Sequence, residues 1–200
     1  MKTSRLAVML SGSGRTLINL IGAVARKGLH AEIPLVIGSR ECLGTERSRA
    51  VGIETLIIPG DVPAEQLEKL LTSRSIDVVA LAGYLRLLKI PPGFQQRIVN
   101  IHPALLPAFG GRGMYGNNVH AAVLAAGCKV SGCTVHYVDD AYDRGPIIAQ
   151  RAVPILIDDN AHALAARVFE AECALYPEAL QLVLTGRVRV EGALTRITSA

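Results

Sequence analysis

Short apolar runs alternate with amphipathic stretches through the first hundred residues. The runs predict strands, and the stretches between them predict helices because their apolar residues recur at three- and four-residue spacing. The expected strands are 5–10, 32–39, 53–59, 76–84 and 97–103, and the expected helices are 16–28, 43–52 and 63–74. The strands are nearly continuous apolar runs, which is typical of a parallel sheet covered on both faces.

The pattern changes in the second half of the chain. The expected elements are a helix at 120–127, two longer strands at 129–140 and 146–155, a long helix at 160–186 and a short strand or tail at 188–192. Asp158, Asp159 or Asn160 is the expected cap of the long helix, and Gly186 is its stop. We predict an α/β fold: a Rossmann-like open, mostly parallel twisted sheet with helices on both faces and an antiparallel C-terminal edge.

Length and composition narrow the class of protein. Two hundred residues, half of them hydrophobic, suit one buried core, so we expect a single domain spanning 1–200. No window approaches 18 consecutive apolar residues, so no membrane partner is expected, and the apolar run Leu6–Leu10 is too short for a signal peptide. A cytoplasmic protein is therefore expected.

Charge and cysteine usage narrow the class of protein further. The net charge of +4 is scattered and the chain has no Trp, which disfavours a nucleic-acid partner and suits a small anionic substrate equally well. The four cysteines form no CxxC pair, and no histidine spacing completes a zinc site. We expect reduced thiols and no metal.

In open parallel sheets, ligands bind at the carboxyl ends of the strands. The first expected strand ends in "SGSGRT", Ser11 to Thr16. Glycines let backbone N–H groups converge at the start of the following helix, where an anion such as phosphate binds well. The segment lacks the third glycine of a dinucleotide fingerprint and has no Walker lysine. By itself it fits a phosphate site and an ordinary strand–helix turn equally well.

The fifth expected strand ends in "NIHP". Asn100 and His102 are two residues apart, so in a strand they project to the same face. Pro103 favours an extended conformation at His102, which keeps that geometry. An amide beside an imidazole suits stabilisation of an oxyanion and movement of a proton. The alternative is a polar pair that bonds to backbone at the strand end.

The segment "TVHYVDDAYDRGP" holds several titratable residues: His136, Asp139, Asp140 and Asp143. Asp and Gly are common in solvated turns, which is one interpretation. In the other, a carboxylate reaches an imidazole, raises its pKa and holds it protonated. Spacing leaves both open, and it leaves His136 as either a sheet-face residue or a site residue.

Five segments together carry a family resemblance. They are "LSGSGRTL", "DVVALAGYLRLL", "VNIHPALLPAF", "SGCTVHYVDDAYDRGPII" and "ALYPEALQLVLTGRV". In this order they resemble the folate-dependent formyltransferase family, and within it the phosphoribosylglycinamide formyltransferase (glycinamide ribonucleotide) branch. The resemblance runs from about Arg5 to about Val190.

The resemblance implies roles for individual residues. The implied catalytic residues are Asn100, His102 and Asp143; the implied ribonucleotide contacts are Gly12, Ser13, Gly14, Arg15, Thr16 and Glu172; and the implied folate contacts are Leu85, Arg86, Leu87, Leu88, Asn100, Val138, Asp139 and Asp140. The implied cosubstrate is 10-formyltetrahydrofolate, with no metal.

The resemblance also implies an activity. The formyl group of 10-formyltetrahydrofolate passes to the primary amine of N1-(5-phosphoribosyl)glycinamide by direct attack, in de novo purine (IMP) biosynthesis, and the enzyme is a monomer or a homodimer. One alternative is another formyl-folate enzyme, namely the 10-formyltetrahydrofolate hydrolase or the methionyl-tRNA formyltransferase. The other is a non-catalytic nucleotide or phosphate sensor, which has no need of the three catalytic residues.

Three features depart from that family's usual pattern. Arg15-Thr16 stands where Ser-Asn is common, and Phe169 stands where a polar substrate contact is often found. The Gly-rich connection "FGGRGMYGNN" (109–118) is several residues longer than usual. Such a loop forms either a lid over a substrate or a surface excursion.

Overall fold

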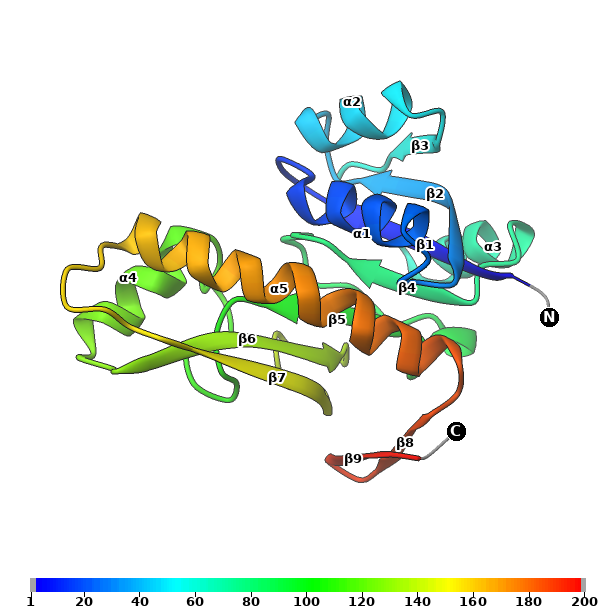
Figure 1. Cartoon of the computed structure of the whole chain (residues 1–200). Helices are drawn as coiled ribbons and strands as arrows, with labels where there is room; N and C mark the ends of the chain where they lie inside the picture. The colour runs from blue at the N-terminus through cyan, green and yellow to red at the C-terminus, as the bar shows by residue number, and fades with distance from the viewer. Residues whose placement is uncertain (1–2, 199–200) are drawn as a thin grey trace.

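A seven-stranded sheet forms the centre of the computed structural model, which describes residues 3–198 (Figure 1). The strand order is β3-β2-β1-β4-β5-β6-β7. The strands are β1 (Ser4–Leu10), β2 (Ala31–Gly38), β3 (Glu54–Ile57), β4 (Val78–Leu81), β5 (Ile98–His102), β6 (Val130–Tyr137) and β7 (Ile147–Pro154). Strands β1 to β5 pair in parallel, whereas β6 and β7 add an antiparallel edge. The predicted fold class is confirmed.

Helices cover both faces of the sheet. They are α1 (Arg15–Ala25), α2 (Leu43–Ala50), α3 (Ala64–Ser73), α4 (Asn117–Ala125) and α5 (Ala161–Leu184), with a 3₁₀ turn at Pro92–Phe94. In Figure 1, α1 and α5 lie side by side over one face and α3 lies behind the other. Two hydrophobic clusters result, one under α1, α4 and α5 and the other under α3.

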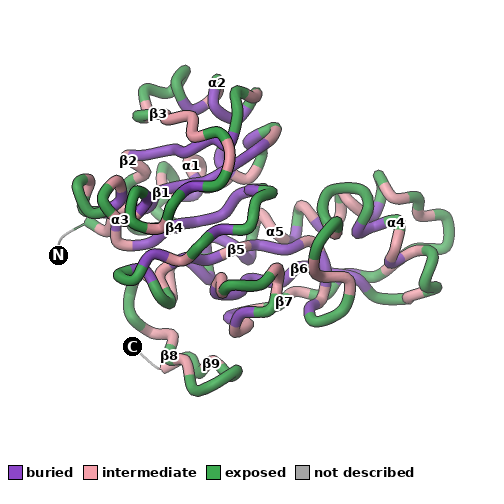
Figure 2. The backbone as a smooth tube through the Cα atoms, turned by 180° about the vertical axis from the view of Figure 1, so that it is seen from behind, coloured by how far each residue is buried: buried purple, intermediate pink, exposed green. Residues whose placement is uncertain are grey.

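Strand β1 shows why the central strands are continuous apolar runs in the sequence. Leu6, Val8 and Leu10 pack into the first cluster, and Ala7 and Met9 pack into the second. Successive side chains point to opposite faces, so a strand that is buried on both faces must be apolar at every position. The buried colouring of β1, β2 and β4 in Figure 2 follows this pattern.

The helix caps and the C-terminus refine the predictions. Among the three candidate caps of α5, Asn160 accepts the backbone N–H groups of His162 and Ala163, each at 3.0 Å. The segment expected as a short strand or tail is the first strand of a hairpin, β8 (Val188–Glu191) and β9 (Leu194–Ile197). Within residues 3–198, no helix combines the length and the apolar character needed to span a bilayer.

Candidate active site

The main cavity opens where the direction of strand addition reverses. Strands β2 and β3 lie on one side of β1, and β4 and the later strands lie on the other, so the loops that follow β1 and β4 diverge there. Ser11, directly after β1, links its loop to the loops after β4 and β2. Its Oγ accepts the N–H of Leu85 at 3.1 Å and the hydroxyl of Ser39 at 2.7 Å. The cavity has a volume of about 570 Å³.

One end of the cavity is formed by the start of α1. Gly14 is the N-cap and supplies no side-chain acceptor, and the first backbone bond of the helix runs from Ile18 N–H to the Gly14 carbonyl at 3.0 Å. The N–H groups of the first turn are therefore left without helical partners. Arg15 and Thr16 line the cavity, whereas Gly12 and Ser13 do not. Free N–H groups, the helix dipole and the Arg15 cation make this end suited to an anion.

Glycine is required at position 14 for a reason that the sequence did not reveal. The residue has a φ of 74°, and a Cβ atom there would lie 2.5 Å from the Cα of Gly44 in α2. The two glycines thus allow the loop after β1 to approach α2 closely. Around Gly12, by contrast, there is open space.

Asn100 and His102 lie near the middle of the cavity wall. Both belong to β5, and both line the cavity, as their two-residue spacing predicts. Asn100 pairs across the antiparallel edge with His136 of β6, and its Nδ2 lies 3.1 Å from His136 Nε2. Because His136 Nδ1 lies 2.8 Å from the Tyr137 carbonyl, the proton of the neutral ring belongs on Nδ1, and Nε2 accepts from the amide.

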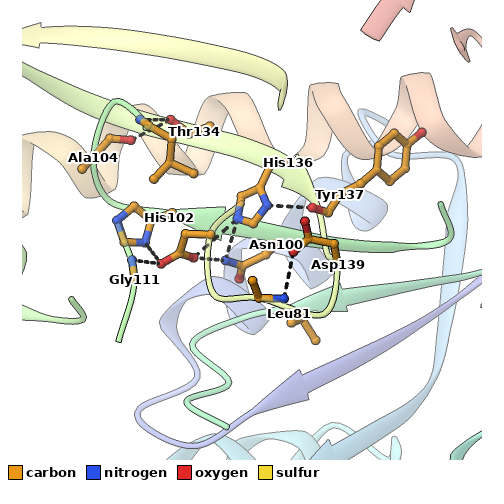
Figure 3. Close-up of polar contacts among 12 residues, drawn as sticks. Leu81, Asn100, His102, Ala104, Gly111, Thr134, His136, Tyr137 and Asp139 are labelled. Atoms are coloured by element: carbon orange, nitrogen blue, oxygen red, sulfur yellow. Dashed lines mark hydrogen bonds and ion pairs between the residues drawn. The ribbon is translucent and has the colours of Figure 1, made fainter. Parts of the chain in front are cut away.

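The carboxylate of Asp143 lies among these side chains (Figure 3). Its Oδ2 lies 3.5 Å from His102 Nδ1 and accepts the Gly111 N–H at 2.9 Å. Its Oδ1 lies 3.6 Å from His136 Nε2 and 3.5 Å from Asn100 Nδ2. Of the two interpretations of the acidic segment, the structure therefore favours the carboxylate that reaches an imidazole.

The protonation state of His102 differs from the expectation. Burial lowers the pKa of His102, and the Asp143 carboxylate and the Phe109 carbonyl raise it only in part, so the pKa lies below its usual value. The carboxylate raises this pKa, as predicted, but the prediction that it holds the ring protonated is wrong, because burial outweighs it. Burial alone would raise the pKa of Asp143, but the His136 and His102 rings, which attract the carboxylate when they are protonated, and the Gly111 N–H outweigh burial and hold that pKa below its usual value.

The Gly-rich connection is part of the site. The Phe109 carbonyl lies 2.9 Å from His102 Nε2, and Gly111 binds Asp143. Residues 111–117 also line the cavity. Of the two interpretations of this loop, the structure favours the one in which it covers a substrate, because residues 111–117 line the cavity and the loop backbone contacts two of the implied catalytic side chains. Residues 112–113 and 115–118 are also exposed to solvent.

Helix α5 forms the wall beside the start of α1. Phe169 and Glu172 are three residues apart, so they lie on one face of the helix, and both line the cavity. Burial raises the pKa of Glu172 to about 7, and the nearby Arg15 cation opposes that rise. Near neutral pH this carboxyl group therefore exists in both forms, so it can donate or accept a hydrogen bond.

The residues implied as folate contacts come from β5 and from the loops that follow β4 and β6. Leu85 lines the main cavity and a second hollow of about 510 Å³, which is also lined by Arg86, Leu87 and Tyr142. Leu88 is buried in the core under α3, and Val138 packs against the same cluster. Asp139 accepts the Ala141 N–H at 3.1 Å. The main cavity is lined by none of Val138, Asp139 and Asp140.

Sequence reasoning left open the two residues that most affect the geometry of this site. His136 orients the Asn100 amide, but its place beside Asn100 depends on the register of an antiparallel pair that the sequence does not specify. Phe169 lies under the Arg15 guanidinium, and the two residues come from helices at opposite ends of the chain. Among residues 3–198, no group of three or more His, Cys, Asp or Glu side chains is arranged to hold a metal ion.

Comparison with known proteins assigns the class. Residues 4–180 match the family described as formyl transferase, and the chain belongs to that family. A relative from Vigna unguiculata named "Phosphoribosylglycinamide formyltransferase, chloroplastic" is 39% identical over 197 residues, which is 94% of this chain and 63% of the relative. The chain thus spans somewhat less than two thirds of that relative's length.

Solved structures agree with this result. The crystal structure of glycinamide ribonucleotide transformylase 1 from Symbiobacterium toebii superposes with a TM-score of 0.90 at 36% identity, covering 98% of this chain and 95% of that one. A formyltetrahydrofolate deformylase from Pseudomonas syringae has a TM-score of 0.85 at 24% identity and covers 99% of this chain and 67% of its own. The second likeness shows a common fold only.

Proposed function

We propose that the protein transfers the formyl group of 10-formyltetrahydrofolate to the primary amine of N1-(5-phosphoribosyl)glycinamide, giving formylglycinamide ribonucleotide and tetrahydrofolate. One observation carries the proposal: a single cavity joins an anion site at the start of α1 to Asn100, His102 and Asp143. A phosphorylated amine bound at the first end reaches an acyl-transfer site at the second. The names of the similar proteins support the choice of substrates.

The reaction is a direct displacement. The amine nitrogen bonds to the formyl carbon, and the carbonyl electrons move to its oxygen, which becomes negatively charged. Collapse of this intermediate re-forms the carbonyl and breaks the bond to the N10 nitrogen of the folate. One proton leaves the attacking amine and one reaches N10, so the enzyme must transfer a proton and stabilise an oxyanion.

Asn100 is the proposed oxyanion donor. One proton of Nδ2 is fixed on His136 at 3.1 Å, whereas the other meets only the distant Asp143 Oδ1 at 3.5 Å. A contact of that length is weak, so this proton is available to a developing oxyanion. The amide is already oriented before substrate binds, which is what makes such a donor effective.

His102 and Asp143 are the proposed proton carriers. Both ring nitrogens of His102 face acceptors, Phe109 O at 2.9 Å and Asp143 Oδ2 at 3.5 Å. A neutral ring satisfies only one of these, and the imidazolium satisfies both. The ring is therefore neutral at rest and becomes favourably placed when it takes the proton that the amine releases. Delivery of that proton to N10 completes the turnover.

The remaining substrate contacts are proposed from where the residues lie relative to the two hollows. Arg15 and Thr16 bind the phosphate with the first turn of α1, shaped by Gly12, Ser13 and Gly14, and Glu172 binds the ribonucleotide from α5. Leu85, Arg86, Leu87 and Leu88, with the backbone of Val138, Asp139 and Asp140, are proposed to hold the folate, close to the hollow that Leu85 shares with the main cavity. We also propose one domain over 1–200 and a cytoplasmic monomer or homodimer.

The deciding experiment is a folate absorbance assay with and without glycinamide ribonucleotide. Tetrahydrofolate should appear only when the amine is present, in an amount equal to the formylated ribonucleotide. Equal formyl loss without the amine would identify a 10-formyltetrahydrofolate hydrolase instead. Binding of the ribonucleotide with no turnover in either mixture would identify a sensor.

A further inference from the structure

The guanidinium group of Arg15 stacks on the ring of Phe169. The Arg15 Cζ lies 3.7 Å from the ring centroid. Arg15 is the first residue of α1, and Phe169 lies on α5, so the contact joins the two helices that cover the same face of the sheet (Figure 1). At this distance the contact is a cation–π interaction, which fixes the plane of an otherwise mobile side chain.

Stacking occupies the face of the guanidinium and leaves its edge free. The N–H donors of Arg point outward in the plane of the group, where they bind phosphate through paired hydrogen bonds. None of the ion pairs found among residues 3–198 involves Arg15. A phenyl ring accepts no in-plane hydrogen bond, so Phe169 orients the cation without competing for its donors.

The pair lies at the boundary between two hollows. Arg15 and Phe169 line the main cavity, and both also line an apolar hollow of about 510 Å³ with Ile18, Arg47, Ala50 and Val51. Without the ring, the side chain of Arg15 is free to turn toward that second hollow. With the ring, the charge stays beside the unpaired N–H groups at the start of α1.

We infer that Phe169 is a positioning residue that holds the Arg15 guanidinium for the phosphate of the ribonucleotide. This inference rests on the proposed function, because it takes a phosphate ester as the ligand at that end of the cavity. Phe169 contributes no polar contact of its own. It determines selectivity for the phosphorylated substrate by restricting where the Arg15 charge can lie.

The test compares substrates with and without the phosphate. Steady-state constants are measured for wild type, Phe169→Leu and Phe169→Tyr, with glycinamide ribonucleotide and with its unphosphorylated riboside. Phe169→Leu should raise KM for the ribonucleotide roughly 3- to 30-fold, as expected for loss of a cation–π contact. It should change kcat and KM for the riboside less than about twofold. Phe169→Tyr keeps the ring and should retain the wild-type KM.

A double-mutant cycle tests whether Phe169 acts through Arg15. In an Arg15→Gln background, Phe169→Leu should have no further effect on KM, because the cation is already gone. Arg15→Lys keeps the charge but loses the planar stack, and it should resemble Phe169→Leu. This surface substitution also serves if Phe169→Leu folds poorly. Additive effects of the two substitutions would overturn the inference, as would an equal loss for ribonucleotide and riboside.

Calorimetric binding separates failure of this inference from failure of the proposed function. If wild type binds the ribonucleotide but transfers no formyl group, the proposed reaction is wrong. The ratio of the affinities for ribonucleotide and riboside, measured in the same variants, then still tests whether Phe169 positions Arg15. If Phe169→Leu and Arg15→Lys both leave that ratio unchanged, the inference is refuted.

Discussion

Asn100 and His136 face each other across the antiparallel pair β5–β6, with the amide Nδ2 3.1 Å from the imidazole Nε2. The imidazole is itself fixed, since its Nδ1 donates to the Tyr137 carbonyl at 2.8 Å. These two contacts fix the orientation of the Asn100 amide, which we propose to be the oxyanion donor. They make His136 a residue that acts through Asn100.

His136→Phe should therefore lower kcat. The ring fills a similar volume but removes the acceptor, so the amide loses its fixed orientation, and we expect a loss of roughly 10- to 100-fold. His136→Gln offers an amide oxygen in place of Nε2 and should recover part of the loss. Stopped-flow measurement of single-turnover formyl transfer distinguishes the two variants, and an unimpaired His136→Phe enzyme would exclude this role.

Asn100→Ala removes the proposed oxyanion donor itself. Loss of one such donor typically costs about 10²–10³ in rate, and the drop should appear in kcat because the interaction forms in the transition state. Ribonucleotide affinity, measured by calorimetry, should stay close to wild type, since the proposed phosphate site lies at the other end of the cavity. A variant with weakened binding and unaltered kcat would contradict this assignment.

The pKa of His102 provides a test independent of turnover. Burial places it below the usual value of histidine, and the Asp143 carboxylate raises it in part. Asp143→Asn removes the negative charge that lies 3.5 Å from the ring, so the pKa should fall further. An NMR titration of the His102 ring measures both values. A rise of the pKa in Asp143→Asn would show that the carboxylate does not stabilise the imidazolium.

Glu172 should make stability depend on pH. Its pKa is raised to about 7 in the folded protein and is near 4.5 in the unfolded chain. Between these two pH values, the carboxyl group is therefore mostly protonated in the folded protein and mostly ionised in the unfolded chain. The stabilisation from this group is present below pH 4.5 and declines as the pH rises toward about 7.

Glu172→Gln should abolish that decline. At pH 8 the variant should unfold with a free energy about 1–3 kcal/mol higher than wild type, and at pH 4.5 the two should be similar. Denaturant unfolding at the two pH values measures the difference. Glu170→Gln, an exposed site on the same helix, is the matched control. Equal pH profiles for wild type and Glu172→Gln would refute the prediction.

Gly14 and Gly12 form a second matched pair. Gly14→Ala places a Cβ 2.5 Å from Gly44 Cα at a φ of 74°, so we expect a loss of about 1–3 kcal/mol in unfolding free energy and weaker ribonucleotide binding as α1 shifts. Gly12→Ala enters open space and should change stability by less than about 0.5 kcal/mol. Thermal unfolding of both variants decides the point, and equal losses would mean that the contact with α2 is not the cause.

Much of the fold could be predicted from the sequence because its strands are short and apolar, and because the helices between them begin and end at recognisable cap, Gly or Pro residues. The predicted strands and helices recur in the observed order, and Asn160 was among the candidate caps. The hairpin strand β9 was missed. Three of its four residues are exposed and the fourth, Thr195, is polar, so no periodic apolar pattern marks it.

The site was predictable only where local geometry decides it. The two-residue spacing of Asn100 and His102 predicts a common face, and both residues line the cavity. The contact between Asn100 and His136 depends on strand register, and the Arg15–Phe169 stack depends on how two helices pack. The protonation of His102 depends on a balance between burial and charge, which residue identity alone does not fix.

The Gly-rich connection has a consequence for inhibitor design. Its backbone supplies the partner of His102 at Phe109 and the partner of Asp143 at Gly111. A compound that draws Gly111 away from the carboxylate would remove a contact that holds the pKa of Asp143 down, and it would thereby impair the proposed proton carriers. Such a compound need resemble neither a folate nor a nucleotide, because its target is the backbone of this segment.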